Sequence, residues 1–178
     1  MMGKSSVPED TFLFVAALYR KEEYLSLARE KLAERFGGII METTPIPWDH
    51  SRYYAEELGR PIKRVFIFFK SRIDPLSLAG IKLATNELEQ QFSTEDKRNI
   101  NLDPGYLTSS KVVLASTKNY SHRIYLGKGI FAEVTLVYID GRYRPHLFTY
   151  RDYASDAYAG IFEDAKKLLV ASGNRADE

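Results

Sequence analysis

Apolar residues along the first half of the chain follow two kinds of pattern. The runs TFLFVAALY (11–19) and IKRVFIFFK (62–70) are short, rich in apolar residues and bounded by polar ones, which is typical of strands buried on both faces. GIIMETT (38–44) predicts another strand. Between these runs apolar residues recur every three or four positions, which predicts a helix over 21–36 and a second helix after Asp74-Pro75.

The second predicted helix carries its inward stripe on positions 78, 81, 85, 88 and 92. This spacing leaves four polar residues on other faces of the helix: Lys82, Asn86, Glu89 and Gln90. The segment 45–61 contains three prolines and WDHSRYY, and we expect a loop there with a turn of helix over 53–58.

The stretch RNINLDPGYLTSSKVVLAS (98–116) predicts a short extended piece, a turn at Asp103-Pro104-Gly105 and another strand. The elements then run strand, helix, strand, strand, helix, strand. This is the order of the split βαβ arrangement, so we expect an α+β fold with a ferredoxin-like βαββαβ core.

Three more strands and a helix follow this core. HRIYL, IFAEVTLVYI and RYRPHLFT are joined by 127–129 and by Asp140-Gly141, a strong hairpin signal. The last helix is predicted to start near Ser155 and to end before Gly173. We therefore expect one domain over 11–172, with the core extended by a C-terminal antiparallel β-meander and a third helix, between flexible ends at 1–10 and 173–178.

The two hairpin loops determine which side chains of the meander share a face. A three-residue loop at 127–129 pairs Arg123 with Glu133 and Leu126 with Ile130, while the two-residue turn pairs residue 137 with 144 and residue 135 with 146. One face then carries the polar residues Arg123, Glu133, Thr135, Arg144 and His146. The other face is expected to pack through Ile124, Leu126, Val134, Leu136 and Leu147, with His122 among them.

Charge and cysteine content narrow the classes of function. The chain has 25 Lys and Arg against 24 Asp and Glu, a net charge of +1, so no strong overall field draws it to nucleic acid or to an anionic membrane. It has no cysteine, which excludes disulfides, thiolate nucleophiles and Cys-ligated metal sites. The start MMGKSSVPED lacks the apolar run of a signal peptide, and no run approaches the ~20 apolar residues of a membrane span. We expect a cytoplasmic protein with neither a membrane nor a nucleic-acid partner.

Two interpretations are open for the paired side chains of the meander. Arg123 opposite Glu133 could clamp an anion and supply a general base, or could form only a cross-strand salt bridge. His122 could transfer protons, or could be a core histidine bonded to the backbone. Lys118, in the loop beside them, could complete a cationic pocket for phosphate or could simply be solvated.

Metal binding is a further possibility. Asp103 could cap its own turn, or with Asn99 and Asn101 could bind a hard cation. His50, His122 and His146 lack the close helical spacing of a metal site. The sequence therefore assigns no metal ligand.

One long stretch carries a family resemblance. RNINLDPGYLTSSKVVLASTKNYSHRIYLGKGIFAEVTLVY, with IKLATNELE before it and TYRDY after it, resembles a prokaryotic family catalogued as domain of unknown function 4416. The likeness spans nearly the whole chain but implies no activity, because the family has none assigned. The residues that match its recurrent motif are Asn86, Glu89, Arg98, Asn101, Asp103, Pro104, Gly105, Tyr106, Lys118, His122, Arg123, Tyr125, Glu133, Thr135, Thr149, Tyr150, Asp152 and Tyr153.

These observations lead to one hypothesis and one alternative. The hypothesis is a polar site within 98–153 that binds, and could act on, a small phosphorylated or carboxylated metabolite, with Mg²⁺ as a conceivable cofactor. The catalytic candidates are His122, Glu133 and Asp103. The ligand-binding candidates are Lys118, Arg123, Arg98, Asn101, Tyr125, Thr135, Tyr150 and Asp152. The alternative is a protein-interaction module, such as a homodimer, that uses a sheet surface rich in the chain's twelve tyrosines.

Overall fold

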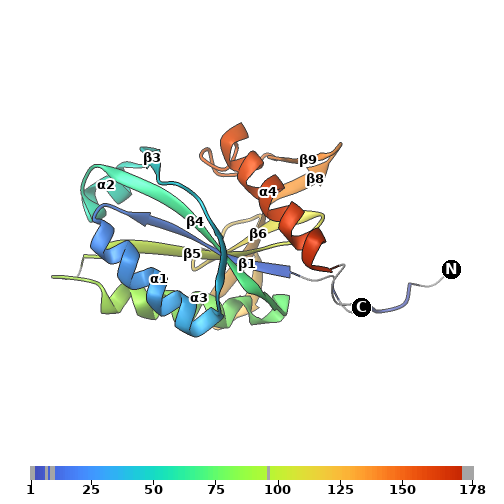
Figure 1. Ribbon diagram of the computed structural model, residues 1–178, viewed down its shortest axis with the longest axis horizontal. Coiled ribbons are helices and arrows are strands. Elements are labelled where there is room, and N and C mark those ends of the chain that lie inside the picture. Colours follow the sequence, from blue (N-terminus) through green and yellow to red (C-terminus); the bar gives the residue numbers. More distant parts are fainter. Residues whose placement is uncertain (1–2, 7, 9–10, 96, 174–178) are drawn as a thin grey trace.

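The computed structural model describes residues 3–6, 8, 11–95 and 97–173. Within these residues the chain is an α+β structure of four α-helices and one nine-stranded sheet whose strand pairings are all antiparallel (Figure 1). The ends 1–10 and 173–178 were expected to be flexible. Most of their residues lie outside the described part of the chain, namely 1–2, 7, 9–10 and 174–178. The elements are β1 (Thr11–Tyr19), α1 (Glu22–Phe36), β2 (Ile39–Glu42), β3 (Ile46–Trp48), α2 (Arg52–Leu58), β4 (Ile62–Ile73), a 3-10 turn (Pro75–Ser77), α3 (Leu78–Gln91), β5 (Ile100–Leu107), β6 (Lys111–Ser116), β7 (Ile124–Gly127), β8 (Ile130–Ile139), β9 (Arg142–Arg144) and α4 (Asp156–Gly173).

The strands lie in the order β2-β4-β1-β5-β6-β8-β7, with β3 paired to β4 and β9 paired to β8. The sequence of strands and helices expected for the first half is confirmed, and β3 and α2 are inserted between β2 and β4. In Figure 1, α1 and α3 lie against one face of the sheet and α4 lies against the other.

The central strand β1 is buried at every position, as its unbroken apolar run predicts. Its two faces belong to two cores. Phe14 packs with Phe66 of β4 and Phe162 of α4, whereas Val15 lies in the cluster that includes Leu25 of α1. Burial on both faces makes this the most apolar layer of the molecule.

The turn expected at Asp103-Pro104-Gly105 is wrong, because these residues lie inside β5. Asp103 pairs with Ala16 of β1, and β6 pairs with β5 only from Gly105 onward. A proline can stand here because it lacks an N–H group and β6 makes no pairing at its position. Gly105 is required by close packing, since a Cβ atom there would lie 2.3 Å from the Val113 carbonyl oxygen. The chain reverses instead at 108–110, where the Thr108 amide bonds the Lys111 carbonyl.

The face assignment of the meander is only partly confirmed. Leu136 is buried as expected, but Ile124 and Leu147, also expected inside, are 71% and 89% exposed. Arg123, Glu133 and Thr135 are buried. A register shift accounts for part of this, since Val112 pairs with Leu136 but Val113 pairs with Val134, which leaves residue 135 as an extra residue between them.

The hairpin registers are partly confirmed. The pairs 137 with 144 and 139 with 142 form as expected. Ile130 pairs with Gly127 and not with Leu126, because a bulge lies between residues 125 and 127. The pair of Thr135 with His146 does not form, because β9 ends at Arg144, directly before a proline.

Two charged residues of α3 also depart from the prediction. Lys82 and Glu89 lie off the predicted inward stripe, on other faces of the helix, yet both are buried against the edge of β5. None of the helices in the described part of the chain has the length and apolar character needed to cross a membrane.

Candidate functional site

A cavity of about 690 Å³ opens where β6 separates from β5. On the N-terminal side of Gly105 the two strands do not pair, so the segment from Asn101 to Asp103 forms one wall and the chain after Leu114 forms another. Side chains from β3, β4, α2, α3 and the segment before α4 close the remaining sides. The volume lies in the range of small-molecule sites.

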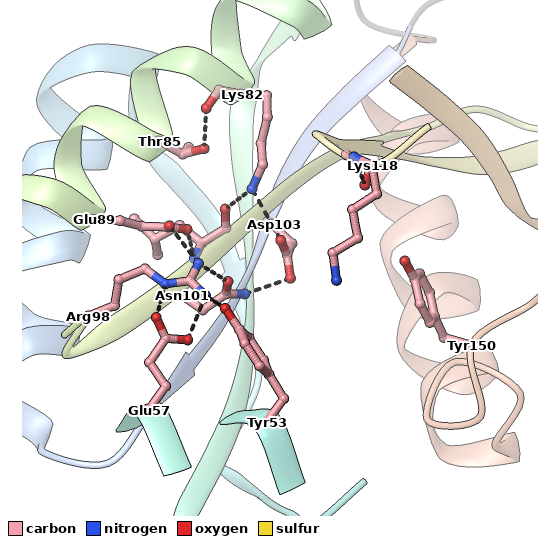
Figure 2. A network of polar contacts seen from close by, with 12 residues as sticks. Tyr53, Glu57, Lys82, Thr85, Glu89, Arg98, Asn101, Asp103, Lys118 and Tyr150 are labelled. Carbon is pink, nitrogen blue, oxygen red and sulfur yellow. Dashed lines mark hydrogen bonds and ion pairs between the residues drawn. The ribbon is translucent and has the colours of Figure 1, made fainter. Parts of the chain in front are cut away.

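The wall formed by β5 holds a carboxylate, that of Asp103, fixed by two donors (Figure 2). The Lys82 ammonium reaches from α3 to the Leu102 carbonyl oxygen at 2.9 Å and to Asp103 Oδ1 at 3.2 Å. Asn101 Nδ2 donates to Asp103 Oδ2 at 2.7 Å. Burial alone would raise the pKa of the Asp103 carboxyl, but the charges of Lys82 and Arg64 outweigh it and hold the pKa below its usual value. Asp103 is therefore ionised near neutral pH.

A second group of charges joins α2, α3 and β5. Arg98 donates to both oxygens of Glu57, at 2.7 and 2.6 Å, and its Nη1 donates to Glu89 at 2.9 Å and to Asn101 at 2.8 Å. Glu89 Oε1 also accepts a hydrogen bond of 2.6 Å from the Leu102 amide. Burial raises the pKa of the Glu89 carboxyl, against the lowering effect of Lys82. Arg98 thus ties the short helix α2 to the wall of the cavity.

The opposite wall is braced by Arg123, whose side chain is 1% exposed. Its Nε donates to Glu133 at 2.6 Å. Its Nη1 donates to Ser116 Oγ at 2.6 Å and to the Lys118 carbonyl oxygen at 2.9 Å, and its Nη2 donates to the Tyr150 phenol oxygen. With every nitrogen bonded to the protein, Arg123 serves as a brace that holds three segments of the wall together.

Glu133 is shared between two partners. The His122 ring nitrogen Nε2 lies 3.1 Å from the same Glu133 oxygen that Arg123 bonds, and the His122 ring stacks on Phe148 with centroids 4.6 Å apart. The sequence predicted that His122 lies on the apolar face of the sheet. In the structure its ring contacts the Glu133 carboxylate instead.

Another guanidinium, that of Arg64 in β4, lines the cavity and is buried. Its Nη2 donates to Asp152 at 3.2 Å, and Asp152 also accepts from Trp48 Nε1 at 2.9 Å and from the Tyr153 amide at 3.0 Å. The aromatic rings of Trp48, Phe66 and Tyr153 surround the guanidinium at 5.8 to 5.9 Å. Its Nε and Nη1 have no hydrogen-bond partner among the residues that the structure describes. Both nitrogens are covered, so Arg64 supplies the cavity with positive charge more than with hydrogen bonds.

Two further cations line the cavity without a carboxylate partner in the described part of the chain: Lys118 and Arg151. The Lys118 ammonium lies 5.8 Å from the centroid of the Tyr53 ring. In Figure 2 it points into the space between Asp103 and Tyr150. By contrast, each lining carboxylate is already bonded to a cation, and these carboxylates are Glu89, Asp103, Glu133 and Asp152.

The structure brings most of the residues expected at the site together. The candidates that line the cavity are Arg98, Asn101, Asp103, Lys118, Glu133, Tyr150 and Asp152. Arg123, His122 and Thr135 lie behind Glu133 and contact it from outside the cavity. Tyr125 lies elsewhere: it is 60% exposed and its ring packs against Phe131.

Several lining residues were not among the sequence candidates. Arg64 stands in the largely apolar run IKRVFIFFK, and Lys82 directly follows Ile81 of the apolar stripe of α3. Charges next to apolar positions of this kind are a usable signal of a buried polar site. Trp48, Tyr53 and Tyr54 come from the segment expected to be mainly loop. No local signal connects that segment with residues 98–153.

The described residues contain no group of three or more His, Asp or Glu placed to hold a metal ion. The set considered for a hard cation is also divided. The Asn99 amide bonds the Phe92 carbonyl and Thr94, while Asp103 is bonded to Lys82. The residues present thus give no coordination site for Mg²⁺ around Asp103.

Comparison with known proteins gives one result. A family model described as Domain of unknown function (DUF4416) matches residues 9–168 of the 178, in agreement with the resemblance of the central stretch. No curated protein and no solved structure matches the chain.

Proposed function

We propose that this chain, which belongs to the family described as a domain of unknown function (DUF4416), binds a small phosphorylated or carboxylated metabolite in the cavity between β5 and β6. The observation that carries the proposal is the charge pairing. The lining carboxylates are all bonded to cations, and the Lys118 ammonium and the Arg151 guanidinium remain for a ligand. The buried charge of Arg64 adds to the positive potential.

The geometry supports binding more than proton transfer. Glu133 is bonded to Arg123 and His122, and Asp103 to Lys82 and Asn101. A general base must be free to approach the proton that it takes. Catalysis by Glu133 or Asp103 would require these bonds to break first, whereas an anion could bind Lys118 with no bond broken.

The test is ligand binding by a matched pair of lysine variants. Lys118→Gln removes the free cavity ammonium, and Lys70→Gln removes an exposed lysine of β4 that does not line the cavity. A panel of nucleotides, sugar phosphates, inorganic phosphate and carboxylates is screened by thermal shift, because a ligand at about 100 times its Kd adds ~2.7 kcal/mol of stability. We expect at least one panel member to bind, and its Kd to rise about tenfold or more in Lys118→Gln only. No shift for any member, or equal loss in both variants, contradicts the proposal.

A second candidate function is supported by the outer face of the meander. Ile124, Leu126, Val134 and Leu147 are exposed there, and β7 is an edge strand of the sheet. Exposed apolar residues beside an open strand edge favour association with a second copy of the chain. Light scattering should then give a dimer for the wild type and a monomer for Ile124→Lys. A monomeric wild type at high concentration would rule this candidate out.

We also propose that β1, α1, β2, β4, α3 and β5 form a ferredoxin-like core. Support comes from the sheet order β5-β1-β4-β2, in which the two strand-helix-strand units interleave, with α1 and α3 on one face. Such a core places β5 at its edge, which is where β6 joins and the cavity begins.

A further inference from the structure

We infer that the ligand of this cavity is a nucleotide, that is, an anion which also carries a planar ring with hydrogen-bonding edges. This inference rests on the anion site proposed above and names the class of ligand that it takes. Three features beside Lys118 support it. They are an exposed aromatic ring, two amide side chains without hydrogen-bond partners in the described part of the chain, and the ion pair of Arg98 with Glu89, which lies next to both.

The aromatic ring is that of Tyr53 in α2, which lines the cavity and is 57% exposed. Its position is fixed from behind by a row of edge-on contacts, since Tyr54 lies 5.2 Å from it and Trp48 lies 5.5 Å from Tyr54. The Lys118 ammonium lies over the Tyr53 ring, 5.8 Å from its centroid. A flat ring that stacks on Tyr53 therefore brings an attached anion close to Lys118.

The amides are those of Asn86 and Gln90, which are one turn apart on α3 and line the same cavity. Neither side chain has a hydrogen-bond partner among the described residues. A carboxamide offers a donor and an acceptor side by side, which matches the edge of a nucleobase. A simple phosphate or carboxylate would leave both amides unused.

Arg98 places these groups next to each other. It donates to Glu89, which lies between Asn86 and Gln90 on the same helix, at 2.9 Å, and its Nη2 lies 3.4 Å from the Tyr53 phenol oxygen. Arg98 thus contacts both α3, through Glu89, and the Tyr53 ring of α2 (Figure 2). The ring subsite is the space between α2 and α3, and the anion subsite begins at Lys118.

The experiment compares ligands with and without a base on the full chain. Calorimetry gives the Kd of the four ribonucleoside monophosphates, the corresponding triphosphates, ribose 5-phosphate and inorganic phosphate. The variants are Tyr53→Leu, Tyr53→Phe and, as a matched control, Tyr125→Leu, which removes a tyrosine that is equally exposed but outside the cavity. Asn86→Leu is a second site variant that does not depend on α2.

We expect at least one nucleotide to bind more tightly than ribose 5-phosphate. Its Kd should rise about tenfold in Tyr53→Leu, because the loss of base stacking on an aromatic ring weakens binding by roughly this factor. Tyr53→Phe and Tyr125→Leu should bind as the wild type does. Asn86→Leu should weaken the nucleotide and leave ribose 5-phosphate unchanged.

Two other outcomes separate this inference from the function on which it rests. If ribose 5-phosphate or a carboxylate binds as tightly as any nucleotide, with a Kd that depends on Lys118 but not on Tyr53 or Asn86, the nucleotide class is wrong and the anion site stands. If no phosphorylated or carboxylated compound binds, both are wrong.

Discussion

Two regions of the cavity wall each bury an arginine, and the surroundings of the two guanidinium groups differ. The side chain of Arg123 is 1% exposed and that of Arg64 is 4% exposed. Arg123 donates to four protein acceptors from three different segments. Among the residues that the structure describes, Arg64 has one hydrogen-bond acceptor, Asp152, and it otherwise faces aromatic rings. Every nitrogen of the Arg123 guanidinium thus has an acceptor in the protein, whereas two nitrogens of Arg64 have none among the described residues.

The difference indicates which region serves stability and which serves a ligand. A buried donor without a partner lowers the stability of the folded state by roughly 1–3 kcal/mol. Arg64 keeps two such nitrogens, so its retention is explained more readily by the charge that it gives the cavity than by stability. Violations of this kind are expected at functional sites.

The largest effect should follow from breaking the complete region. In Arg123→Met, Glu133 stays buried with only His122 and Thr135 near it, and the Tyr150, Ser116 and Lys118 oxygens lose their donor. We expect a loss of about 3–5 kcal/mol in the free energy of unfolding, measured with urea. Arg151→Met, which removes an exposed arginine, is the control and should change it by less than about 0.5 kcal/mol.

A double variant checks that the loss comes from the stranded carboxylate. Replacing Glu133 by Leu in the Arg123→Met background removes the uncompensated charge and should restore part of the stability. A single variant that loses less than about 1 kcal/mol would show that the two regions do not differ in the way described.

A smaller effect on stability is expected from the incomplete region. Arg64→Met removes two partnerless nitrogens, and Asp152 keeps its donors from Trp48 and Tyr153. We expect a loss of about 1–2 kcal/mol in the free energy of unfolding, together with weaker binding of whichever anion the cavity takes. A loss as large as that of Arg123→Met, with ligand affinity unchanged, would mean that Arg64 is structural.

The sequence predicts the first of these regions better than the second. Arg123 and Glu133 are only 10 residues apart in the chain, on either side of one hairpin, so register arithmetic finds their contact even though one pairing is shifted by a bulge. Arg64 and Asp152 are 88 residues apart and meet only through the packing of α4 and β4. No periodicity reports such a contact.

The same reasoning explains the main errors in the fold. The unbroken run of β1 was predicted because burial on both faces needs no knowledge of its neighbours. Asp103-Pro104-Gly105 has the composition of a turn, but a proline and a glycine also suit a strand that loses one neighbour and passes close to another. Local composition is the same in both cases, and only the path of β6 distinguishes them.

The smallest effect concerns pH, and it compares two carboxylates on the wall opposite Arg123. Asp103 has a lowered pKa in the folded protein, so its contribution to stability is present above the ordinary value of 3.8 and is lost as the pH falls through the lowered pKa. Glu89 has a raised pKa, so its contribution is present below the ordinary value of 4.5 and is lost as the pH rises through the raised pKa. The two contributions therefore change with pH in opposite directions in the wild type. Urea unfolding of Asp103→Asn and Glu89→Gln between about pH 3 and 7 should therefore show differences from the wild type that change with pH in opposite directions. If both differences in the free energy of unfolding change with pH in the same direction, the two carboxylates do not have the opposite pKa shifts expected from their contacts with Lys82 and Arg98.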